Sequence, residues 1–407
     1  MKNIKIIVGA NFGDEGKGLM TDYFSSISSN SIVVRFNGGA QAGHTVVTPD
    51  GKRHVFSHFG SGTFNKVPTY LSEYFICNPT LYKKEFLELK AYDINPMVHF
   101  AHDCMFSNPF DMLINQIVES NINSNNTYTC KNGSCGVGIN ETIERYKTLP
   151  FRHIDIFSTS YMRHYLNKIK SEYIYKRLKT YGITNIPLKF LEPLLSDSII
   201  NNYLEDLEFF LNHAYMSYKP EMLNNYDDLI FEGAQGLLLD KNSVYYPNVT
   251  PTNTGIKNAL RLIKQYINFD YDLEICYVSR HYVTKHGIGY FPLQLNHKPN
   301  KYVKDLTNIP NEFQGELRYG SLDINTLNRQ IKDDLSILGK IISHTYILSL
   351  AMTCLDQCNG YIDYYFNDNR WATNISKFID TLKDVIFLDN IYMSFGETQD
   401  DIIKLKQ

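Results

Sequence analysis

The sequence lacks several features that would each assign a function at once. The 407 residues carry a net charge of −3, so no basic excess points to nucleic acid or to an anionic membrane surface. We find no apolar run of membrane-spanning length, and the N-terminal stretch reaches Asp14 and Glu15 too early for a signal peptide. These absences favour a cytoplasmic protein that acts on small molecules.

Patterned cysteines are missing as well. Seven cysteines are scattered along the chain without a C-x-x-C pair. Cys354 and Cys358 are four residues apart, but no histidine pair follows them at zinc-finger spacing. We therefore expect no zinc site, and a reduced, cytosolic setting fits this cysteine usage.

The standard glycine fingerprints for nucleotide binding are also missing, although a glycine-rich turn is present. The apolar run 4–8 indicates a buried strand, and the letters GANFGDEGKG follow it from Gly9 to Gly18. A P-loop would need glycine at Asn11 and serine or threonine at Gly18, and G-x-G-x-x-G is not matched either. Glycines still let backbone N–H groups approach a ligand, and Lys17 adds a positive charge. We predict a phosphate-binding turn between this strand and a first helix.

Comparable turns follow the other predicted strands. In α/β sheets, ligands bind outside the carboxyl ends of the strands. His44 lies in one of these glycine turns, and we interpret it as functional. The pattern predicts an α/β protein around one mostly parallel sheet. The further strands and their turns are 31–36 before 37–45, 228–231 before 232–236, 274–279 before a stretch with Arg280, His281, Lys285 and His286, and 346–352 before 353–356.

Two other segments have a recognisable character. A turn of small residues spans 133–140, which suggests backbone contacts to a charged ligand. Apolar residues recur at helical intervals through 158–220. We interpret this range as a helical insertion in a single domain, 1–407.

Polar loops make up much of the rest. Hydroxyls and amides at 247–254 suit recognition of a base or a phosphate. A polar loop is expected at 311–320, with Arg318 able to bind a carboxylate or phosphate through two N–H groups. A helix is expected after it, to about residue 343.

In this order, the motifs resemble those of adenylosuccinate synthetase. The matching stretches are GDEGKG (13–18), AGHT (42–45), FEGAQG (231–236), YPNVTPTNT (246–254), RYGSLD (318–323), TCLD (353–356) and SFG (394–396). The resemblance spans nearly the whole chain. It implies one large α/β domain around a mostly parallel sheet, a P-loop-NTPase-like fold with helical insertions. It also implies a cytoplasmic homodimer with small-molecule substrates and with neither nucleic acid nor membrane as a partner.

The resemblance also implies a reaction. The family joins L-aspartate to C6 of a 6-oxopurine nucleoside monophosphate through a 6-phosphoryl intermediate, with hydrolysis of GTP or ATP. Asp14 would take the N1 proton and His44 would stabilise the charge at the 6-oxygen, with Lys17 and Gln235 as further catalytic residues. Mg²⁺ would be held by Asp14 and a carbonyl near Gly43.

The remaining implied roles concern binding. Arg318 would take the aspartate carboxylate, with Gln314 and Gly315 beside it. Asp356, Ser394 and Gly396 would hold the base of the phosphoryl donor. The full set of implied nucleotide-binding residues is Gly13, Glu15, Gly16, Gly18, Gln41, Ser134, Cys135, Thr250, Asp356, Ser394 and Gly396.

The chain departs from the family pattern at several substrate contacts. Gln41 stands where asparagine is usual, Ser134-Cys135 replaces a pair of threonines, and Cys354 replaces a lysine. The loop before Arg318 is shortened, and Arg318 is the one arginine left where several are usual. The arginine that reaches the neighbouring subunit's nucleotide has two candidates, Arg145 and Arg152.

Three functions stay open at this point. Asp14 is retained in GDEGKG, which favours the ordinary reaction of IMP, L-aspartate and GTP to adenylosuccinate. The departures and the AT-rich composition favour a viral type that acts on dGMP with ATP and makes 2-amino-N6-succinyl-2′-deoxyadenylate for diaminopurine DNA, in the host cytoplasm. The third is a non-catalytic purine-nucleotide-binding protein, which the presence of Asp14, Lys17 and His44 disfavours. Asp356 favours GTP as donor, and the missing lysine leaves ATP open.

Overall fold

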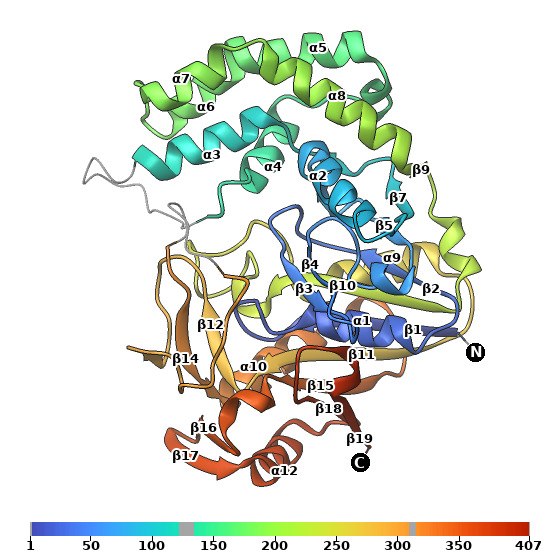
Figure 1. Ribbon diagram of the computed structural model, residues 1–407, viewed down its shortest axis with the longest axis vertical. Helices are drawn as coiled ribbons and strands as arrows, with labels where there is room; N and C mark the ends of the chain where they lie inside the picture. Colours follow the sequence, from blue (N-terminus) through green and yellow to red (C-terminus); the bar gives the residue numbers. More distant parts are fainter. Residues whose placement is uncertain (1, 122–133, 309–314, 407) are drawn as a thin grey trace.

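A ten-stranded sheet forms the centre of the computed structural model, which describes residues 2–121, 134–308 and 315–406 (Figure 1). Neighbouring strands in this sheet run parallel, except for the antiparallel pair of β18 and β19 at one edge. The predicted mostly parallel α/β architecture is confirmed. From edge to edge the strands are β19 (Ile402–Lys406), β18 (Asn390–Ser394), β15 (Ile347–Thr353), β11 (Tyr271–Arg280), β1 (Lys2–Gly9), β10 (Asp228–Gly236), β2 (Ser31–Arg35), β5 (Thr69–Leu71), β7 (Val98–Ala101) and β9 (Tyr215–Ser217).

The first strand lies inside this sheet. Ile4 of β1 pairs with Leu229 of β10 on one side and with Leu273 of β11 on the other. Ile4, like Val8, is fully buried, as expected for a parallel strand that is covered on both faces. The strands predicted at 4–8, 31–36, 228–231, 274–279 and 346–352 correspond to β1, β2, β10, β11 and β15.

Helices pack on the sheet, and a further group of helices stacks beyond its β7–β9 end, at the top of Figure 1. The range 158–220 holds α5 to α8, with a π-helical stretch at Ile169–Tyr173, and ends in the edge strand β9. Within the described ranges, no helix combines the length and apolar character needed to cross a membrane. The helices are α1 (Lys17–Ser26), α2 (Pro79–Lys90), α3 (Pro109–Asn121), α4 (Ile139–Thr148), α5 (Thr159–Lys168), α6 (Ile174–Thr180), α7 (Leu188–Leu195), α8 (Ser198–His213), α9 (Lys257–Tyr266), α10 (Ile324–Leu335), α11 (Leu338–Ile341) and α12 (Ile375–Ile386).

A second, smaller sheet lies beside the carboxyl end of β11. Its main path is β12, β14, β16 and β17, and β13 also pairs with β14. Two short strand pairs, β3 with β4 and β6 with β8, complete the strands described. Their bounds are β3 (His44–Val47), β4 (Arg53–Phe56), β6 (Ile76–Cys77), β8 (Met105–Phe106), β12 (Tyr282–Lys285), β13 (Gln294–Leu295), β14 (Arg318–Asp323), β16 (Tyr361–Phe366) and β17 (Asn369–Asn374).

The sequence prediction for 311–320 is wrong at its end. Arg318–Asp323 is strand β14 and not part of a polar loop, and α10 begins directly after it. Gly320 and Leu322 are buried, while the other residues of β14 are partly exposed. This alternation is short and carried by a glycine and one leucine, so the apolar pattern that marks a strand is too weak to detect. The helical stretch expected to residue 343 consists of α10 and the short α11.

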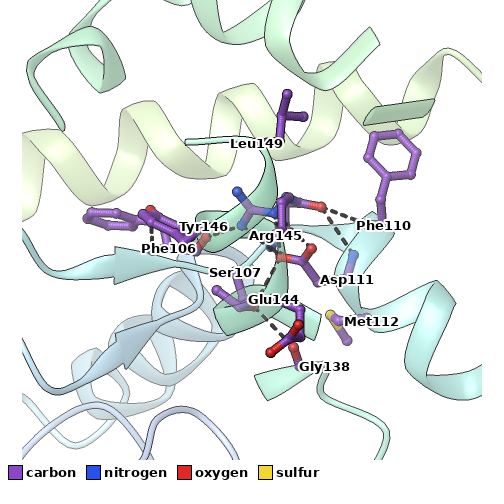
Figure 2. A network of polar contacts seen from close by, with 12 residues as sticks. Phe106, Ser107, Phe110, Asp111, Met112, Gly138, Glu144, Arg145, Tyr146 and Leu149 are labelled. Atoms are coloured by element: carbon purple, nitrogen blue, oxygen red, sulfur yellow. Dashed lines mark hydrogen bonds and ion pairs between the residues drawn. The ribbon is translucent and has the colours of Figure 1, made fainter. Parts of the chain in front are cut away.

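A buried ion pair holds the corner between α3 and α4 (Figure 2). The Nε of Arg145 lies 2.8 Å from Oδ1 of Asp111, and its Nη2 lies 2.8 Å from Oδ2. Arg145 also donates to the Phe106 carbonyl at 2.7 Å and to the Tyr165 hydroxyl at 3.0 Å. A Cβ on Gly138, which precedes α4, would lie 2.6 Å from the Asp111 carbonyl carbon. The network therefore fixes where α4 begins.

We expect Arg145→Met to destabilise the protein by about 3–5 kcal/mol, because it leaves the buried Asp111 carboxylate without its partner. Arg152→Met is the matched control, since the Arg152 side chain is 80% exposed although it contacts Asp155 at 2.7 Å. The control should leave the unfolding midpoint unchanged. Urea denaturation of the two variants measures the difference, and equal midpoints would contradict the role assigned to the buried pair.

Candidate active site

The turn after β1 has a backbone that depends on glycine. Gly13 and Gly16 have φ angles of 104° and 102°, and Asp14 between them has a φ of 63°. A Cβ on Gly16 would lie 3.0 Å from the Thr353 side chain, so glycine is needed there for space as well. The left-handed conformation is uncommon for an aspartate and occurs often at functional sites.

Glu15 lies inside this turn. Its Oε1 accepts the N–H groups of Asn11 at 3.0 Å and Gly13 at 2.7 Å, and its Oε2 lies 2.7 Å from the Nζ of Lys17. Glu15 and Lys17 are both nearly fully buried, at 2% and 3% exposed. The Glu15 carboxylate thus holds the turn together from within, while its predicted contact with a nucleotide stays a prediction.

Asp14 contacts a residue from the far part of the sequence. Its Oδ2 lies 2.7 Å from the Nε2 of His286, which is also 3.0 Å from the Oδ1 of Asn308. Burial alone would raise the pKa of Asp14, but the hydrogen bond and charge of His286 outweigh it and lower the pKa to about 2. Asp14 is therefore ionised at neutral pH. The sequence analysis gave His286 no role, since it noted this residue only within a basic stretch.

His44 is held by a second buried carboxylate. Its Nδ1 lies 2.6 Å from the Oε1 of Glu232, and Glu232 also accepts the Ser61 N–H at 3.1 Å and the Ser61 hydroxyl. Burial lowers the pKa of His44, and Glu232 opposes that shift. Burial would raise the pKa of Glu232, but His44 and Arg35 lower it to about 2. His44 therefore donates its Nδ1 proton to Glu232, and when the ring is protonated it also carries an Nε2 proton that a ligand can accept.

Glu232 is a residue to which the sequence analysis assigned no role, although it lies in the matched motif FEGAQG. It is fully buried near the carboxyl end of β10. A carboxylate that ends an otherwise apolar strand is the feature that could have revealed it, because such a group needs buried donors. Gly18 leaves the space that His44 occupies, since a Cβ on residue 18 would lie 3.0 Å from the Cβ of His44.

A cavity of about 620 Å³ collects several of the predicted nucleotide-binding residues. Gln41, Ser134, Cys135, Gln235 and Thr250 all line it. The first residues of α4 and the preceding Gly138 line it too, and a helix N-terminus favours a phosphate. His286 also belongs to the lining, which places the cavity next to Asp14.

Polar groups in this cavity have free capacity for a ligand. The Oε1 atoms of Gln41 and Gln235 are buried and have no hydrogen-bond partner among the described residues. Gln235 also has a left-handed backbone, with φ of 57°. The Ser134 hydroxyl lies 2.9 Å from the Nδ2 of Asn115, and burial raises the pKa of the Cys135 thiol. One hydroxyl and one neutral thiol therefore replace the two hydroxyls of the family pattern.

The predicted donor-base residues follow two neighbouring strands. Asp356 is exposed in η6 (Leu355–Cys358), the short 3₁₀ helix after β15. Ser394 ends β18, and its hydroxyl donates to the Gly396 carbonyl at 2.6 Å. Because β15 and β18 are paired in parallel, both turns lie at the carboxyl ends of these strands, on the same side of the sheet. The Thr353 hydroxyl donates to the Glu15 carbonyl at 2.6 Å, which connects the carboxyl end of β15 to the turn after β1.

The predicted aspartate-binding residues are only partly described. Arg318 begins β14, and its Nη1 donates to the Gly289 carbonyl at 3.1 Å. Gly315 is exposed and has a φ of 73°. Gln314 lies outside the described residues. Arg318 is thus the member of this group whose side-chain contacts the structure describes.

The residues around Asp14 fit Mg²⁺. This ion takes oxygen ligands, commonly one or two carboxylates with substrate phosphates and waters. In the described ranges no group of three His, Cys, Asp or Glu side chains could hold a metal by itself, so phosphates would have to complete the coordination. The Asp14 side chain is 24% exposed, and Gly43, whose carbonyl is the second predicted ligand, is exposed beside His44.

One of the two candidate intersubunit arginines is ruled out by its position. Arg145 is 1% exposed and its guanidinium is committed to Asp111, so it cannot reach a neighbouring subunit. Both residues had been chosen from sequence position alone, which does not reveal burial. Arg152 is exposed and stays a candidate.

The fold and the site together define a nucleotide-binding α/β protein whose polar turns gather at the carboxyl ends of parallel strands. The sequence profile of the adenylosuccinate synthetase family matches residues 6–361. The chain therefore belongs to the adenylosuccinate synthetase family. It is accordingly a ligase of purine biosynthesis, of the kind that attaches aspartate to a purine nucleotide, in a family that generally uses GTP and Mg²⁺.

Individual relatives support this assignment. The adenylosuccinate synthetase of Pelodictyon phaeoclathratiforme is 28% identical over 97% of this chain and 89% of its own length. Across eight such relatives the matched region covers 63% to 89% of the relative.

Two solved structures share the fold. The fully ligated adenylosuccinate synthetase of Plasmodium falciparum has a TM-score of 0.72 at 20% identity, over 99% of this chain and 100% of its own. The succinoaminodeoxyadenylate synthetase PurZ of cyanophage S-2L, bound to dGMP and dATP, has a TM-score of 0.59 at 13% identity. That match covers 99% of this chain and 95% of PurZ. At these identities both likenesses concern the fold alone.

A third buried carboxylate lies on α1, the helix that begins at Lys17. Asp22 is 1% exposed, and its Oδ1 accepts the Nδ2 of Asn65 at 2.7 Å. Its Oδ2 is buried and has no hydrogen-bond partner among the described residues. Burial raises the pKa of Asp22 to about 7, and the charge of Glu232 adds to that shift. Asp22 therefore binds a proton in the folded protein at pH values where the unfolded chain has released it.

This difference in the pKa of Asp22 between the folded and the unfolded chain predicts that Asp22 lowers the folding stability in a pH-dependent way. Because the folded pKa lies above the ordinary value of 3.8, folding stability should fall as the pH rises from about 4 to about 7. Asp22→Asn removes the ionisable group, so the variant should be more stable than the wild type by roughly 4 kcal/mol at pH 8 and by much less at pH 4.

Urea denaturation at the two pH values measures this effect. Asp50→Asn is the control, since Asp50 lies on the surface. A stability difference between Asp22→Asn and the wild type that does not change with pH would contradict a protonated Asp22.

Proposed function

We propose that this protein joins L-aspartate to C6 of IMP with hydrolysis of GTP, giving adenylosuccinate, GDP and phosphate. The observation that carries the proposal is a pair of supported side chains, Asp14 and His44, of which Asp14 adjoins a polar cavity through His286. Asp14 is held by His286 and His44 by Glu232, and His286 lines the cavity that holds Gln41, Gln235 and Thr250. This is the arrangement that a base and a charge-stabilising group need around a bound purine.

The first step transfers a phosphoryl group. Ionised Asp14 takes the proton from N1 of IMP, and O6 attacks the γ-phosphorus of GTP while the bond to the bridging oxygen of GDP breaks. His44 stabilises the charge that develops at O6. The N–H groups of Gly16 and Gly18 bind the phosphates, and Lys17, which is paired with Glu15, adds positive charge beside them, while the Gly13 N–H is used by Glu15. Asp14 and a carbonyl near Gly43 would hold Mg²⁺, which would supply further positive charge beside the phosphates.

The second step forms the new C–N bond. The amine of L-aspartate attacks C6, the C6–O bond breaks and phosphate leaves, with the amine proton passing to solvent or to the departing phosphate. Arg318 binds an aspartate carboxylate, with Gln314 and Gly315, which precede it in the sequence, as further aspartate-binding residues. Gln235 and Thr250 hold the purine nucleotide, whose phosphate is placed at the N-terminus of α4 with Gln41, Ser134 and Cys135. Asp356, Ser394 and Gly396 hold the guanine of the donor.

A second candidate is supported by one feature of the cavity. The Oε1 of Gln41 is a buried acceptor without a partner among the described residues, and an exocyclic 2-amino group is a donor that could use it. This favours dGMP as the acceptor nucleotide and ATP as the donor, with 2-amino-N6-succinyl-2′-deoxyadenylate as product. The PurZ structure with dGMP and dATP has the same fold, which is compatible with this candidate.

We further propose a cytoplasmic homodimer, on the family resemblance. Arg152 is the arginine that would reach the nucleotide of the neighbouring subunit, because its side chain is 80% exposed. A virus-encoded enzyme would act in the host cytoplasm.

We expect Asp14→Asn to lower kcat about 10²- to 10⁴-fold, because the amide cannot accept the N1 proton. The nucleotide KM values should change far less. Asp93→Asn is the matched control, since Asp93 also has a left-handed backbone, with φ of 60°, and lies exposed outside the site. Steady-state assays of product formation measure both variants. Nucleotide-dependent activity that is unchanged in Asp14→Asn relative to the wild type would contradict the catalytic proposal. It would favour a non-catalytic nucleotide-binding protein.

A substrate competition decides between the two acceptors. Purified protein receives L-aspartate, Mg²⁺, GTP and ATP, with IMP and dGMP in equal amounts, and the products are identified by mass. Adenylosuccinate alone supports the proposal. The 2-amino deoxy product alone replaces it with the second candidate, and the absence of both products contradicts the ligase reaction with either nucleotide.

A further inference from the structure

Two cationic residues lie opposite each other on neighbouring strands of the second sheet. β12 and β14 are antiparallel, and Lys285 of β12 is the direct partner of Arg318 of β14. Side chains of such directly opposed residues lie on the same face of the sheet, and like charges in this position are destabilising. The pair therefore needs a reason beyond the stability of the sheet.

No carboxylate among the described residues neutralises either cation. The Nζ of Lys285 donates to the Ile288 carbonyl at 2.7 Å and to the His286 carbonyl at 3.4 Å. The Nη1 of Arg318 donates to the Gly289 carbonyl and to the Oε1 of Gln294, at 3.1 and 3.0 Å. These acceptors are neutral, so both positive charges persist.

Arg318 also has unused donors. Its Nε and Nη2 are buried and have no hydrogen-bond partner among the described residues. These two atoms form one side of the guanidinium, the side that binds a carboxylate through two parallel N–H groups. An unpaired buried donor is costly, so a bound anion would stabilise this arrangement.

Lys285 is more deeply buried than a lysine without a counter-ion normally is. It is 2% exposed, and burial together with the Arg318 charge lowers its pKa to about 8. Beyond the two carbonyls, it lies 5.5 Å from the centre of the Phe12 ring, a weaker compensation. Lys285 lines the cavity that holds Gln235 and Thr250. An anion bound by Lys285 would therefore lie beside the purine nucleotide.

We infer that Lys285 is a substrate-binding residue, which together with Arg318 binds the two carboxylates of L-aspartate. This rests on the proposed function, in which aspartate attacks C6 of the bound purine, and it adds a residue to which no role in the reaction had been assigned. A dicarboxylate matches two adjacent cations in charge. Lys285 supplies a second cation beside Arg318, which is the one arginine of this part of the sequence.

The test compares KM values in variants of the whole enzyme. Lys285→Met should raise the KM for L-aspartate about 10- to 100-fold, the loss expected for one charge-assisted hydrogen bond, and should change both nucleotide KM values less than about threefold. Lys285→Arg keeps the charge and should restore most of the affinity. Lys285→Gln keeps a donor for the Ile288 carbonyl without the charge, so it separates loss of charge from loss of folding.

Lys298→Met is the matched control. Lys298 is exposed, donates to the Val303 carbonyl at 3.3 Å and does not belong to the cavity lining, so its loss should leave all three KM values unchanged. Thermal melting with the nucleotides bound checks that each variant is folded.

The outcomes separate this inference from the proposed function. An active wild type with an unchanged aspartate KM in Lys285→Met and Lys285→Gln would overturn the inference and leave the function intact. A nucleotide KM that rises in place of the aspartate KM would also overturn it, and would place Lys285 at a phosphate. A wild type that forms no aspartate adduct with IMP or dGMP would overturn both.

Discussion

The buried carboxylate of Glu15 is the interaction on which the site depends. A carboxylate that is 2% exposed must be surrounded by donors, and Glu15 obtains them from the backbone of Asn11 and Gly13 and from Lys17. The contact also requires space, because a Cβ on Gly236 of β10 would lie 2.6 Å from its Oε1. One side chain thereby joins the end of β1, the following turn, the start of α1 and the end of the neighbouring strand. The conformation of Asp14 follows from these constraints.

Glu232 holds His44 in place by hydrogen bonding, as Glu15 holds the turn after β1. Both carboxylates lie where parallel strands end, and both are compensated by backbone N–H groups and by a cation or histidine. Such networks are costly when one member is missing and rigid when all are present. His44 and the turn that carries Asp14 are therefore held in place without a ligand, which in the proposed reaction limits the rearrangement required.

The strands and their polar turns could be predicted because both are local patterns in the sequence, as the run 4–8 before GDEGKG illustrates. The partners of Asp14 and His44 could not be predicted. Glu232 is separated from His44 by 188 residues and His286 from Asp14 by 272, so only the sheet topology brings them together. Strand β14 was missed because its alternation rests on one glycine and one leucine. The burial of Arg145 likewise depends on how α3 and α4 pack, which no local pattern encodes.

The order of strands in the sheet has a consequence for biosynthesis. β1 leaves the ribosome before both of its partner strands, since Asn3 bonds to Asp228, 225 residues later, and Leu273 of β11 follows later still. At typical elongation rates of about 5–20 residues per second, the apolar segment 4–8 waits roughly 10 to 45 s for its first neighbour. Strands β2, β5 and β7 can pair with one another in that interval, but β1 cannot join them until β10 is made. The segment that precedes the turn of Glu15 thus stays without its sheet neighbours during this interval, and unpaired apolar strands of this kind are prone to aggregation.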